Sequence, residues 1–234
     1  MNASVQAISI PSLIWVFVPA AVVVAVLIRW KTSARTAAHA LGRMLIQLLL
    51  IGYVLAFIFE ADQAWIILLV LSVMLAAASV IAIRPIRNNR RSSLRNAFLA
   101  ILIGGGLTLA LVTQVVIGIE PWFLPRYMVP LAGMVFASSM NAVSLAAERL
   151  ESELERSVEL SQARSSALNA SLIPLINTLF AVGLVSLPGM MTGQILSGVS
   201  PFIAAKYQIV VMCMIFGASG ISATIYLSLS GHRH

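Results

Sequence analysis

The stretch Ser186–Gln194, SLPGMMTGQ, combines residue types that an ordinary lipid-facing helix does not need. It holds a helix breaker, a flexible residue, two thioethers and two polar side chains, namely Pro188, Gly189, Met190, Met191, Thr192 and Gln194. Because proline lacks an N–H, we expect a helix to end or break here, and broken helices persist in membranes where they line a wet path. The stretch therefore predicts a broken or re-entrant segment near Pro188–Val199 that contributes to a gate on a translocation path.

Two thioethers and one carboxylate give the chain possible metal ligands. The sulfur atoms of Met190 and Met191 are soft ligands, although methionine is more often flexible apolar filler. Glu120 stands between Ile119 and Pro121, where its carboxylate could help to release a cation or be an ordinary loop residue. No His, Cys or Glu cluster has the spacing of a structural or catalytic metal site. A transport path needs weak, exchangeable ligands, so the absence of such a cluster does not exclude a metal as the transported cargo.

Polar side chains also interrupt the long apolar segments. Ser138 and Asn141 are three residues apart, on one helical face with Met134, and Asn177 lies in a later apolar segment. Within a membrane such residues either hold helices together by hydrogen bonds or line a pathway. We predict that these four residues line the translocation path.

The motif Gly217-Ala-Ser-Gly220 resembles the GxSG motif of rhomboid intramembrane serine proteases. That chemistry needs a histidine base at membrane depth. The histidines His39, His232 and His234 all lie outside the apolar segments, and small residues also serve close helix packing. A protease is therefore disfavoured, and the chain is not expected to be an enzyme.

The amino-acid composition indicates that these candidate residues belong to a protein embedded in a membrane. Of the 234 residues, 60% are apolar and only 10% are charged, so lipid must cover the surface. We predict an all-α, polytopic transmembrane helical bundle that forms a single permease domain over residues 1–234. About seven segments can cross the bilayer, at roughly Pro11–Ile28, Met44–Phe59, Ala64–Ile83, Ala97–Ile119, Tyr127–Ala147, Ala167–Leu187 and Tyr207–Leu229.

The distribution of charge predicts the orientation. All 15 basic residues except Arg126 and Lys206 fall in alternate connections or the tail, on one side of the membrane. Since basic loops stay in the cytoplasm, we expect the N-terminus outside and the C-terminus inside the cell. The net charge of +7 is then explained by topology and anionic headgroups, and binding of nucleic acid is not expected.

The longest polar stretch, Glu148–Ser166, predicts a cytoplasmic helical extension of the fifth crossing with an acidic face. Arg149 can pair with Glu153 at helical spacing, and Arg156 with Glu153 or Glu159. The alternative is a solvated connector without a partner. We predict that the extension docks an ATPase through charged residues at its surface, namely Glu148, Arg149, Glu151, Glu155, Arg156 and Glu159.

Several stretches together resemble one known family. They are Ala181–Gln194 (AVGLVSLPGMMTGQ), Gly42–Phe59, Pro130–Leu150, Ser171–Asn177 and Ala204–Met212, in the right order and over most of the chain. This text is similar to the FetB-type iron-export ABC transporter permeases, which are related to plant aluminium-tolerance permeases. The link before Leu172-Ile173-Pro174 is shorter here and lacks the family's Leu-Gly-Ala element, so docking could use a different surface.

The resemblance implies the permease subunit of an ABC exporter in the plasma (inner) membrane, which moves a metal cation, iron in the first place, out of the cytoplasm. The chain has no GxxxxGK[ST] element, so ATP-Mg would be bound by a separate ATP-binding subunit, and no cofactor is expected in this chain. The resemblance also implies a homodimer of permease chains in the lipid bilayer. The alternative is a stand-alone secondary transporter of a small solute.

Overall fold

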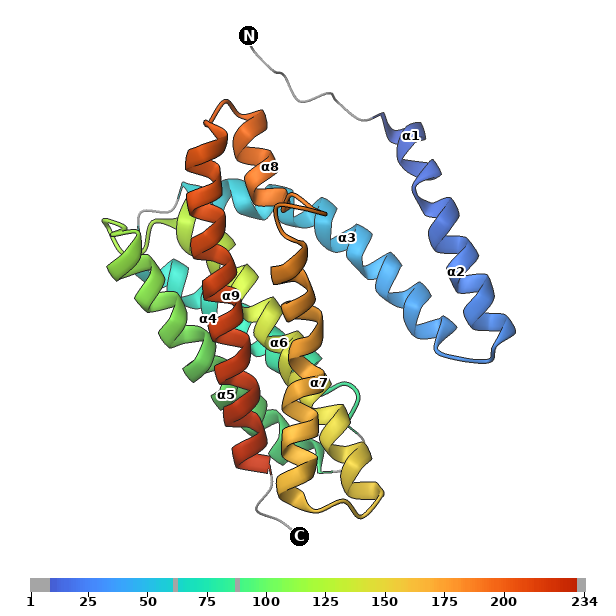
Figure 1. Ribbon diagram of the computed structural model, residues 1–234. Helices are drawn as coiled ribbons and strands as arrows, with labels where there is room; N and C mark the ends of the chain where they lie inside the picture. The colour runs from blue at the N-terminus through green and yellow to red at the C-terminus, as the bar shows by residue number, and fades with distance from the viewer. Residues whose placement is uncertain (1–8, 61–62, 87–88, 231–234) are drawn as a thin grey trace. The chain divides into compact units, whose positions relative to one another are not determined.

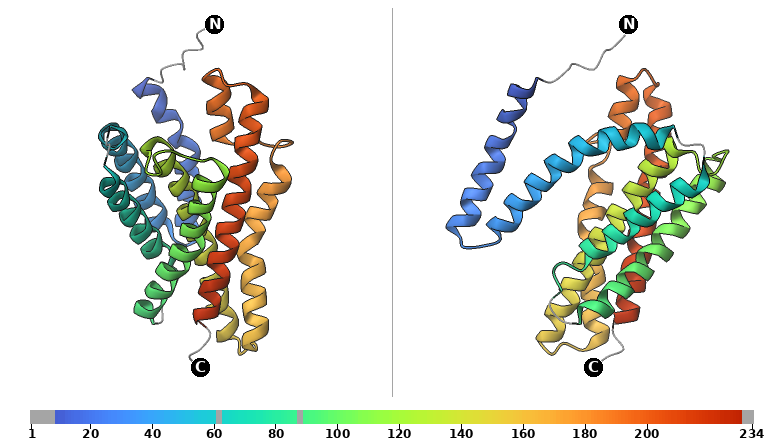
Figure 2. Two further views of the ribbon diagram at one scale, coloured as in Figure 1. Left: turned by 90° about the vertical axis from the view of Figure 1, so that its left-hand side faces the viewer. Right: turned by 180° about the vertical axis from the view of Figure 1, so that it is seen from behind.

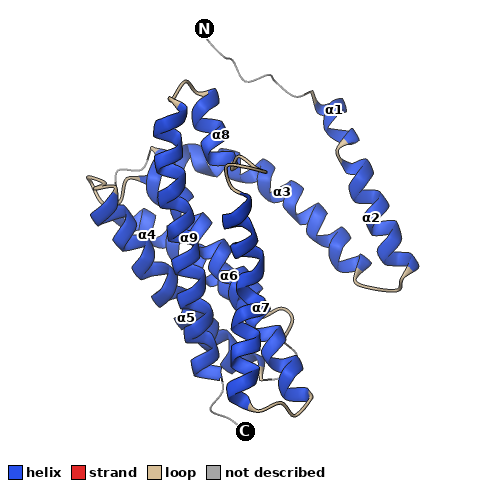
Figure 3. Cartoon of the chain, viewed as in Figure 1, coloured by secondary structure: helices blue, strands red, loops and turns tan. Residues whose placement is uncertain are grey.

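The chain divides into two units, Met1–Glu60 and Ala61–His234, and each is described by itself. The computed structural model describes residues 9–60, 63–86 and 89–230. Within these residues every regular element is a helix, as Figure 3 shows, and the only strand-like feature there is an isolated bridge between Val182 and Ser186. The all-α prediction is confirmed. That both units belong to one permease domain stays a prediction.

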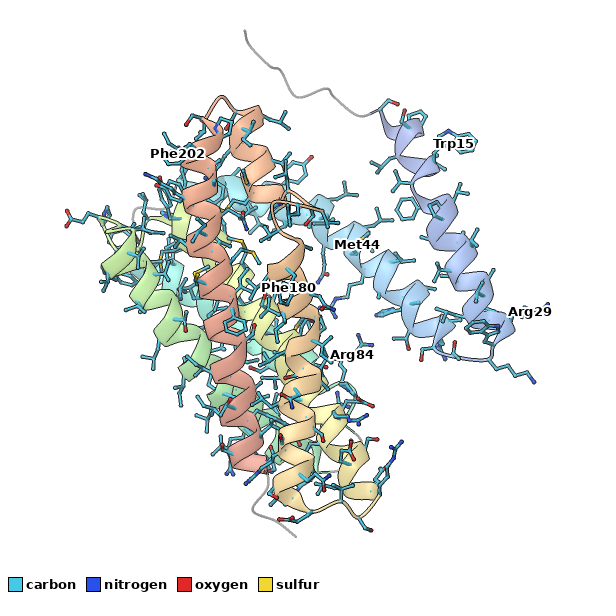
Figure 4. All side chains as sticks on the ribbon, in the orientation of Figure 1. Trp15, Arg29, Met44, Arg84, Phe180 and Phe202 are labelled. Carbon is cyan, nitrogen blue, oxygen red and sulfur yellow. The ribbon has the colours of Figure 1, made fainter. Side chains whose placement is uncertain are left out.

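The first unit contains three helices, α1 (Ile10–Trp15), α2 (Phe17–Arg29) and α3 (Ala34–Phe59). Ser9 caps α1 by accepting a hydrogen bond from the Ser12 N–H at 3.3 Å. Neither α2 nor α3 buries a residue within the chain, which suits helices that lipid surrounds. Figure 4 shows Trp15, Arg29 and Met44 along these helices.

The start of α3 differs from the sequence prediction. The second crossing was expected to begin at Met44, but α3 begins at Ala34. The intervening residues are rich in alanine and arginine, which favour helix, so the helix continues through the basic link. The start of an apolar stretch predicts where a helix enters the bilayer. It does not predict the first residue of the helix.

The second unit is a bundle in which successive helices run up and down (Figures 1 and 2). Its elements are α4 (Ala64–Ala82), α5 (Arg90–Ala110), the π-helical turn η1 (Leu111–Val116), α6 (Pro125–Glu155), α7 (Leu160–Ala181), α8 (Gly189–Leu196) and α9 (Pro201–Ser230). Helix α9 lies against both α5 and α6, and α7 lies against α6. The α4–α5 link, the α6–α7 turn and the end of α9 lie at one end of the bundle (Figure 2). We call it the basic end, because Arg84, Arg90, Arg156 and Arg164 lie in or near these segments.

Small residues allow α5 and α9 to approach closely. A Cβ atom built on Gly104 would lie 2.5 Å from the Ser222 Oγ and 2.7 Å from the Ser222 backbone nitrogen. Gly105 faces Val135 and Phe136 of α6 in the same way, at 3.1 Å and 3.3 Å. In lipid, the hydrophobic effect does not drive helices together. Small residues at such contacts allow close van der Waals packing, which stabilises the helix pair instead. The core of the second unit is therefore narrow and sensitive to added volume.

Six helical segments in the described residues are long and apolar enough to cross a membrane. The remaining predicted segment, Ala167–Leu187, falls instead on most of α7 and on the break that follows it, before α8 begins. Figures 1 and 2 show α8 continuing toward the end that α7 approaches, after which α9 returns. The predicted polytopic bundle is confirmed, and helix α7 with the break after it is not among the six candidate spans.

Candidate functional site

A cavity of about 140 Å³, lined by both polar and apolar side chains, lies between α6, α7 and α9 in the second unit. Two of the predicted path residues, Ser138 and Asn141, line it from α6. Helix α7 contributes Ser171 and Thr178, and α9 contributes Ser219. The remaining lining residues are Ala142, Leu145, Pro174 and Leu175. The cavity therefore presents neutral hydroxyl and amide groups at membrane depth.

The hydroxyl groups around the cavity differ in how they are satisfied. Ser171 Oγ donates to the Leu168 carbonyl at 2.7 Å, and Thr178 Oγ1 donates to the Pro174 carbonyl at 2.9 Å. Ser219 is 1% exposed, and its Oγ finds no hydrogen-bond partner within the described part of the chain. A buried hydroxyl without a partner costs about 1–3 kcal/mol, so its presence in a cavity wall calls for a partner from outside the fold.

The cavity opens on the surface that α6 and α7 share. Asn141 and Leu145 of α6 and Pro174 and Thr178 of α7 are all exposed, whereas Ser219 forms the buried floor. Asn177, the remaining predicted amide, is exposed on α7 next to Thr178 and does not line the cavity itself. A solute could therefore reach the Ser219 hydroxyl from the α6–α7 surface.

The break between α7 and α8 is a turn of defined geometry. Gly183 has φ +83°, a backbone conformation that favours glycine. The Ala181 carbonyl accepts from the N–H groups of Leu184, Val185 and Ser186 at 2.8–3.2 Å, and so ends α7. Helix α8 then starts after Pro188, whose carbonyl accepts from the Thr192 hydroxyl at 3.2 Å. Transporter folds use such discontinuous helices at their substrate paths.

The other predicted residues of the gate belong to α8 and its start. Pro188, Thr192 and Gln194 are half-buried, and Gly189 is exposed. The Gln194 Oε1 is buried and finds no hydrogen-bond partner in the part that the structure describes. None of these residues lines the polar cavity. The break directly follows the part of α7 that lines the cavity, and the gate role of the break stays a prediction.

The three predicted metal ligands do not come together around the cavity. Met190 and Met191 are half-buried in the first turn of α8, and Glu120 is exposed in the loop after η1. Met134 is half-buried on α6 and also does not line the cavity. Within the described residues no three His, Cys, Asp or Glu side chains could hold one metal ion together. Any cation in the cavity would meet oxygen ligands.

Sequence reasoning missed three polar residues of the cavity, namely Ser171, Thr178 and Ser219. Ser171 and Thr178 are seven residues apart, with Pro174 between them, a spacing that places all three on one face of a helix. Ser219 was noticed only as part of Gly217–Gly220. No histidine lines the cavity, as serine protease chemistry would require. The periodicity of the α7 hydroxyls was the signal that could have found the site.

The predicted helical extension at residues 148–166 is wrong in its length. Helix α6 ends at Glu155, Ser157 adopts φ +60°, and α7 begins at Leu160. The turn returns the chain because Leu150 of α6 and Ala163 of α7 belong to one buried cluster with Leu227 of α9. The apolar stripe expected on an exposed helix is therefore part of the core.

The charged residues in and near this turn differ in their exposure to solvent. Glu148, Glu155, Arg156 and Glu159 are exposed, and Glu151 and Arg149 are half-buried. Glu151 and Glu155 also line a cavity of about 340 Å³ at the basic end, with Ser92, Asn96, Tyr226 and Ser230. The acidic surface expected for an ATPase partner is thus present at the α6–α7 turn, and its docking role stays a prediction.

The predicted ion pair between Arg149 and Glu153 is confirmed, with an Nη2–Oε1 distance of 2.5 Å. Neither predicted pairing of Arg156 is among the ion pairs of the described residues. Glu153 is 7% exposed, and the Arg149 Nε is buried without a hydrogen-bond partner in the same described residues. Removing Glu153 alone would leave a partly buried guanidinium uncompensated.

We expect Glu153→Leu to lower the free energy of unfolding by about 1–2 kcal/mol, because Arg149 keeps only part of its solvation. The double variant Arg149→Met/Glu153→Leu is expected to lose less, since both charges leave together. Thermal unfolding in detergent measures both. A double variant that is less stable than Glu153→Leu would contradict the expectation that Arg149 is destabilising when it loses its partner.

Comparison with known proteins places these features in a family. The model of the "Uncharacterised protein family (UPF0014)" matches residues 10–234. The chain belongs to the UPF0014 family. A UPF0014 membrane protein of Synechocystis sp. is 39% identical over 207 residues, which cover 79% of each chain. No solved structure matches.

Two further relatives have names that refer to a metal. The "Probable iron export permease protein FetB" of Escherichia coli is 32% identical over 222 residues, covering 87% of this chain and 84% of the relative. The "Protein ALUMINUM SENSITIVE 3" of Arabidopsis thaliana is 34% identical over 200 residues, covering 79% and 72%. The resemblance inferred from Ala181–Gln194 and its flanking stretches is confirmed. This chain is an integral membrane protein of a family that includes a named permease.

Proposed function

We propose that this chain is the permease subunit of an ABC exporter that moves a metal cation out of the cytoplasm, with iron as the favoured cargo. It is placed in the plasma (inner) membrane with its N-terminus outside and its basic end in the cytoplasm. The observation that carries the proposal is the broken crossing α7–α8 beside a polar cavity that opens on α6 and α7. The name of the relative FetB supports iron and export.

The power for transport comes from a separate subunit that binds ATP-Mg. Closure of two such subunits acts on the charged α6–α7 turn, where Glu155 and Arg156 are exposed. Motion of this turn tilts α7, while the Val182–Pro188 break uncouples α7 from α8. Discontinuous helices allow such hinge movements without the loss of regular helical hydrogen bonds. The cavity then changes its access from the basic end to the opposite end.

A transport site must bind its cation weakly enough to release it. Hydroxyl and amide oxygens replace part of a hydration shell without the tight hold of thiolates or several carboxylates. The cavity volume of about 140 Å³ equals that of roughly four or five water molecules, given about 30 Å³ for each. A partly hydrated cation therefore fits the cavity. Met190, Met191 and Glu120 would act later, on the exit side of the break.

If the thioethers handle the cargo on its way out, the variant Met190→Leu/Met191→Leu is expected to lower the rate of metal transport several-fold. Its stability should change by less than about 1.5 kcal/mol, because leucine and methionine have similar volumes. Transport into vesicles and thermal unfolding in detergent measure the two effects. Unchanged transport would assign both methionines to packing.

Copurification tests the need for a partner. The tagged chain, expressed with a candidate ATP-binding subunit from the same genome, should retain that subunit through purification in detergent. Charge reversal at Glu155 and Glu159 together should release it, whereas Glu120→Lys at the opposite end should not. If the chain alone moves cargo in proteoliposomes without any ATPase, it is a secondary transporter and the proposal fails.

A further inference from the structure

The cavity of about 340 Å³ at the basic end runs from exposed to buried side chains. It lies between α5, α6 and α9, and we call it the basic-end cavity. Asn89 and Glu155 in its lining are exposed, whereas Asn96 and Tyr226 are only 6% and 2% exposed. The cavity therefore opens at the basic end and reaches buried polar groups inside the bundle. Its polar lining residues are Asn89, Ser92, Ser93, Asn96, Glu151, Glu155, Tyr226 and Ser230.

The basic-end cavity carries negative charge, although arginines lie at the same end of the bundle. Glu151 and Glu155 both line it, and none of the described residues in its lining is Lys, Arg or His. The two glutamates are four residues apart on α6, so they share a helical face, where like charges destabilise the helix. A cation beside both carboxylates removes that repulsion, whereas an anion would add to it. The charge of the lining therefore favours a cation.

The neutral polar groups of the basic-end cavity also offer oxygen atoms. The Asn96 Nδ2 donates to the Ser230 Oγ at 3.3 Å, and the Asn96 Oδ1 accepts no hydrogen bond within the described residues. The Tyr226 hydroxyl interacts with Ser93 and Ser230. A buried acceptor without a donor is costly, and a bound cation would satisfy it. Carboxylate, carbonyl and hydroxyl oxygens are the ligands that hard divalent cations such as Mn²⁺ prefer.

One face of α9 connects the basic-end cavity with the cavity between α6, α7 and α9. Tyr226 lines the first cavity, and Ser219 lines the second. Ser222 is three residues from Ser219 and four from Tyr226, which places all three near one helical face. The Ser222 hydroxyl is buried and has no hydrogen-bond partner among the residues that the structure describes. Polar oxygens therefore continue along α9 through the buried interior, from one cavity to the other.

We propose that the basic-end cavity is a loading site, which binds a hard divalent cation through Glu151, Glu155 and the Asn96 Oδ1 before the ion moves along α9. The role in loading rests on the proposed transport function, whereas the binding itself does not. Two carboxylates hold a cation more firmly than neutral oxygens alone. The basic-end cavity therefore collects the ion from the cytoplasm, and the neutral cavity between α6, α7 and α9 passes it on.

Binding of Mn²⁺ to the purified chain in detergent tests the site without ATPase or transport. The electron paramagnetic resonance signal of free Mn²⁺ follows the titration, and thermal unfolding checks that each variant is folded. Glu151→Gln should weaken binding at least about tenfold, because it removes one of two carboxylates. Asn96→Asp should strengthen binding several-fold, because it adds a carboxylate of nearly the same shape. The matched control Glu60→Gln removes an exposed carboxylate at the end of α3 and should leave the titration unchanged.

Two results of the titration would overturn the inference. One is the absence of saturable Mn²⁺ binding by the folded parent chain. The other is binding that neither Glu151→Gln nor Asn96→Asp changes, which would place the ion outside the basic-end cavity.

A transport assay separates this inference from the proposed function. In inverted vesicles, Glu151→Gln should raise the metal concentration that gives half-maximal transport. Transport with an unchanged half-saturating concentration would contradict the loading role alone. Mn²⁺ binding that follows the variants as expected, without any ATP-dependent metal transport, would contradict the proposed function alone.

Discussion

Replacing Gly104 with alanine is expected to lower the free energy of unfolding by about 3 kcal/mol, the upper end of the usual cost of overpacking. The added Cβ would lie 2.5 Å from the Ser222 Oγ and 2.7 Å from the Ser222 backbone nitrogen. Rotation of the serine relieves only the first contact. The second requires α9 to move away from α5, and these two helices form the most extensive contact in the bundle. Thermal unfolding in detergent and the yield of monodisperse protein measure the effect.

Gly106→Ala is the matched control for Gly104→Ala. It lies in the same glycine run, but its added Cβ would meet only the Leu102 Cδ1, at 3.9 Å. Because alanine favours helix over glycine by about 1 kcal/mol, this variant is expected to be as stable as the parent or slightly more stable. Equal losses at Gly104 and Gly106 would show that the run needs flexibility rather than space, and would contradict the packing described for α5 and α9.

The second large effect is expected at the cavity. Asn141→Leu should lower metal transport at least tenfold, because it removes an amide from the lining and adds apolar volume to a space of about 140 Å³. Stability should change little within one chain, since Asn141 is exposed there. Uptake of radioactive metal into inverted vesicles measures the rate, and the amount of permease in the same vesicles corrects for expression.

Asn141→Gln keeps the amide and serves as the control for Asn141→Leu. It should retain much more transport than the leucine variant, although the longer side chain reduces the cavity. Full transport by Asn141→Leu would show that the cargo does not pass this cavity. Equal loss in both variants would assign the effect to volume rather than to the amide oxygen.

Much of the fold could be predicted because lipid imposes simple rules. Apolar length predicted the six long apolar helices, and the Pro188-Gly189 pair predicted the break, since both depend on local sequence alone. The helix ends were harder. Helix α3 starts before the apolar stretch because its basic link also favours helix, and α6 ends at Glu155 because Leu150 packs against α7 and α9.

The candidate site could be predicted only in part. Ser138 and Asn141 were found because their spacing on one segment is visible in the sequence. Ser171, Thr178 and Ser219 complete the cavity from two other helices, and only tertiary packing brings them to Ser138. The predicted ligands Met190 and Met191 lie on α8, which follows the cavity helix α7 in the chain, but they do not line the cavity. Helix packing, rather than residue type, decides which polar groups meet.

The central claim is that this chain needs an ATPase to export a metal cation. Inverted vesicles that hold the permease and its ATP-binding subunit test it directly, with ATP added outside and a panel of metals that includes ferrous iron. We predict ATP-dependent accumulation of iron that is lost without the ATPase and falls at least tenfold in Asn141→Leu. Vesicles that accumulate no metal with ATP, or that accumulate it equally without the ATPase, would contradict the account.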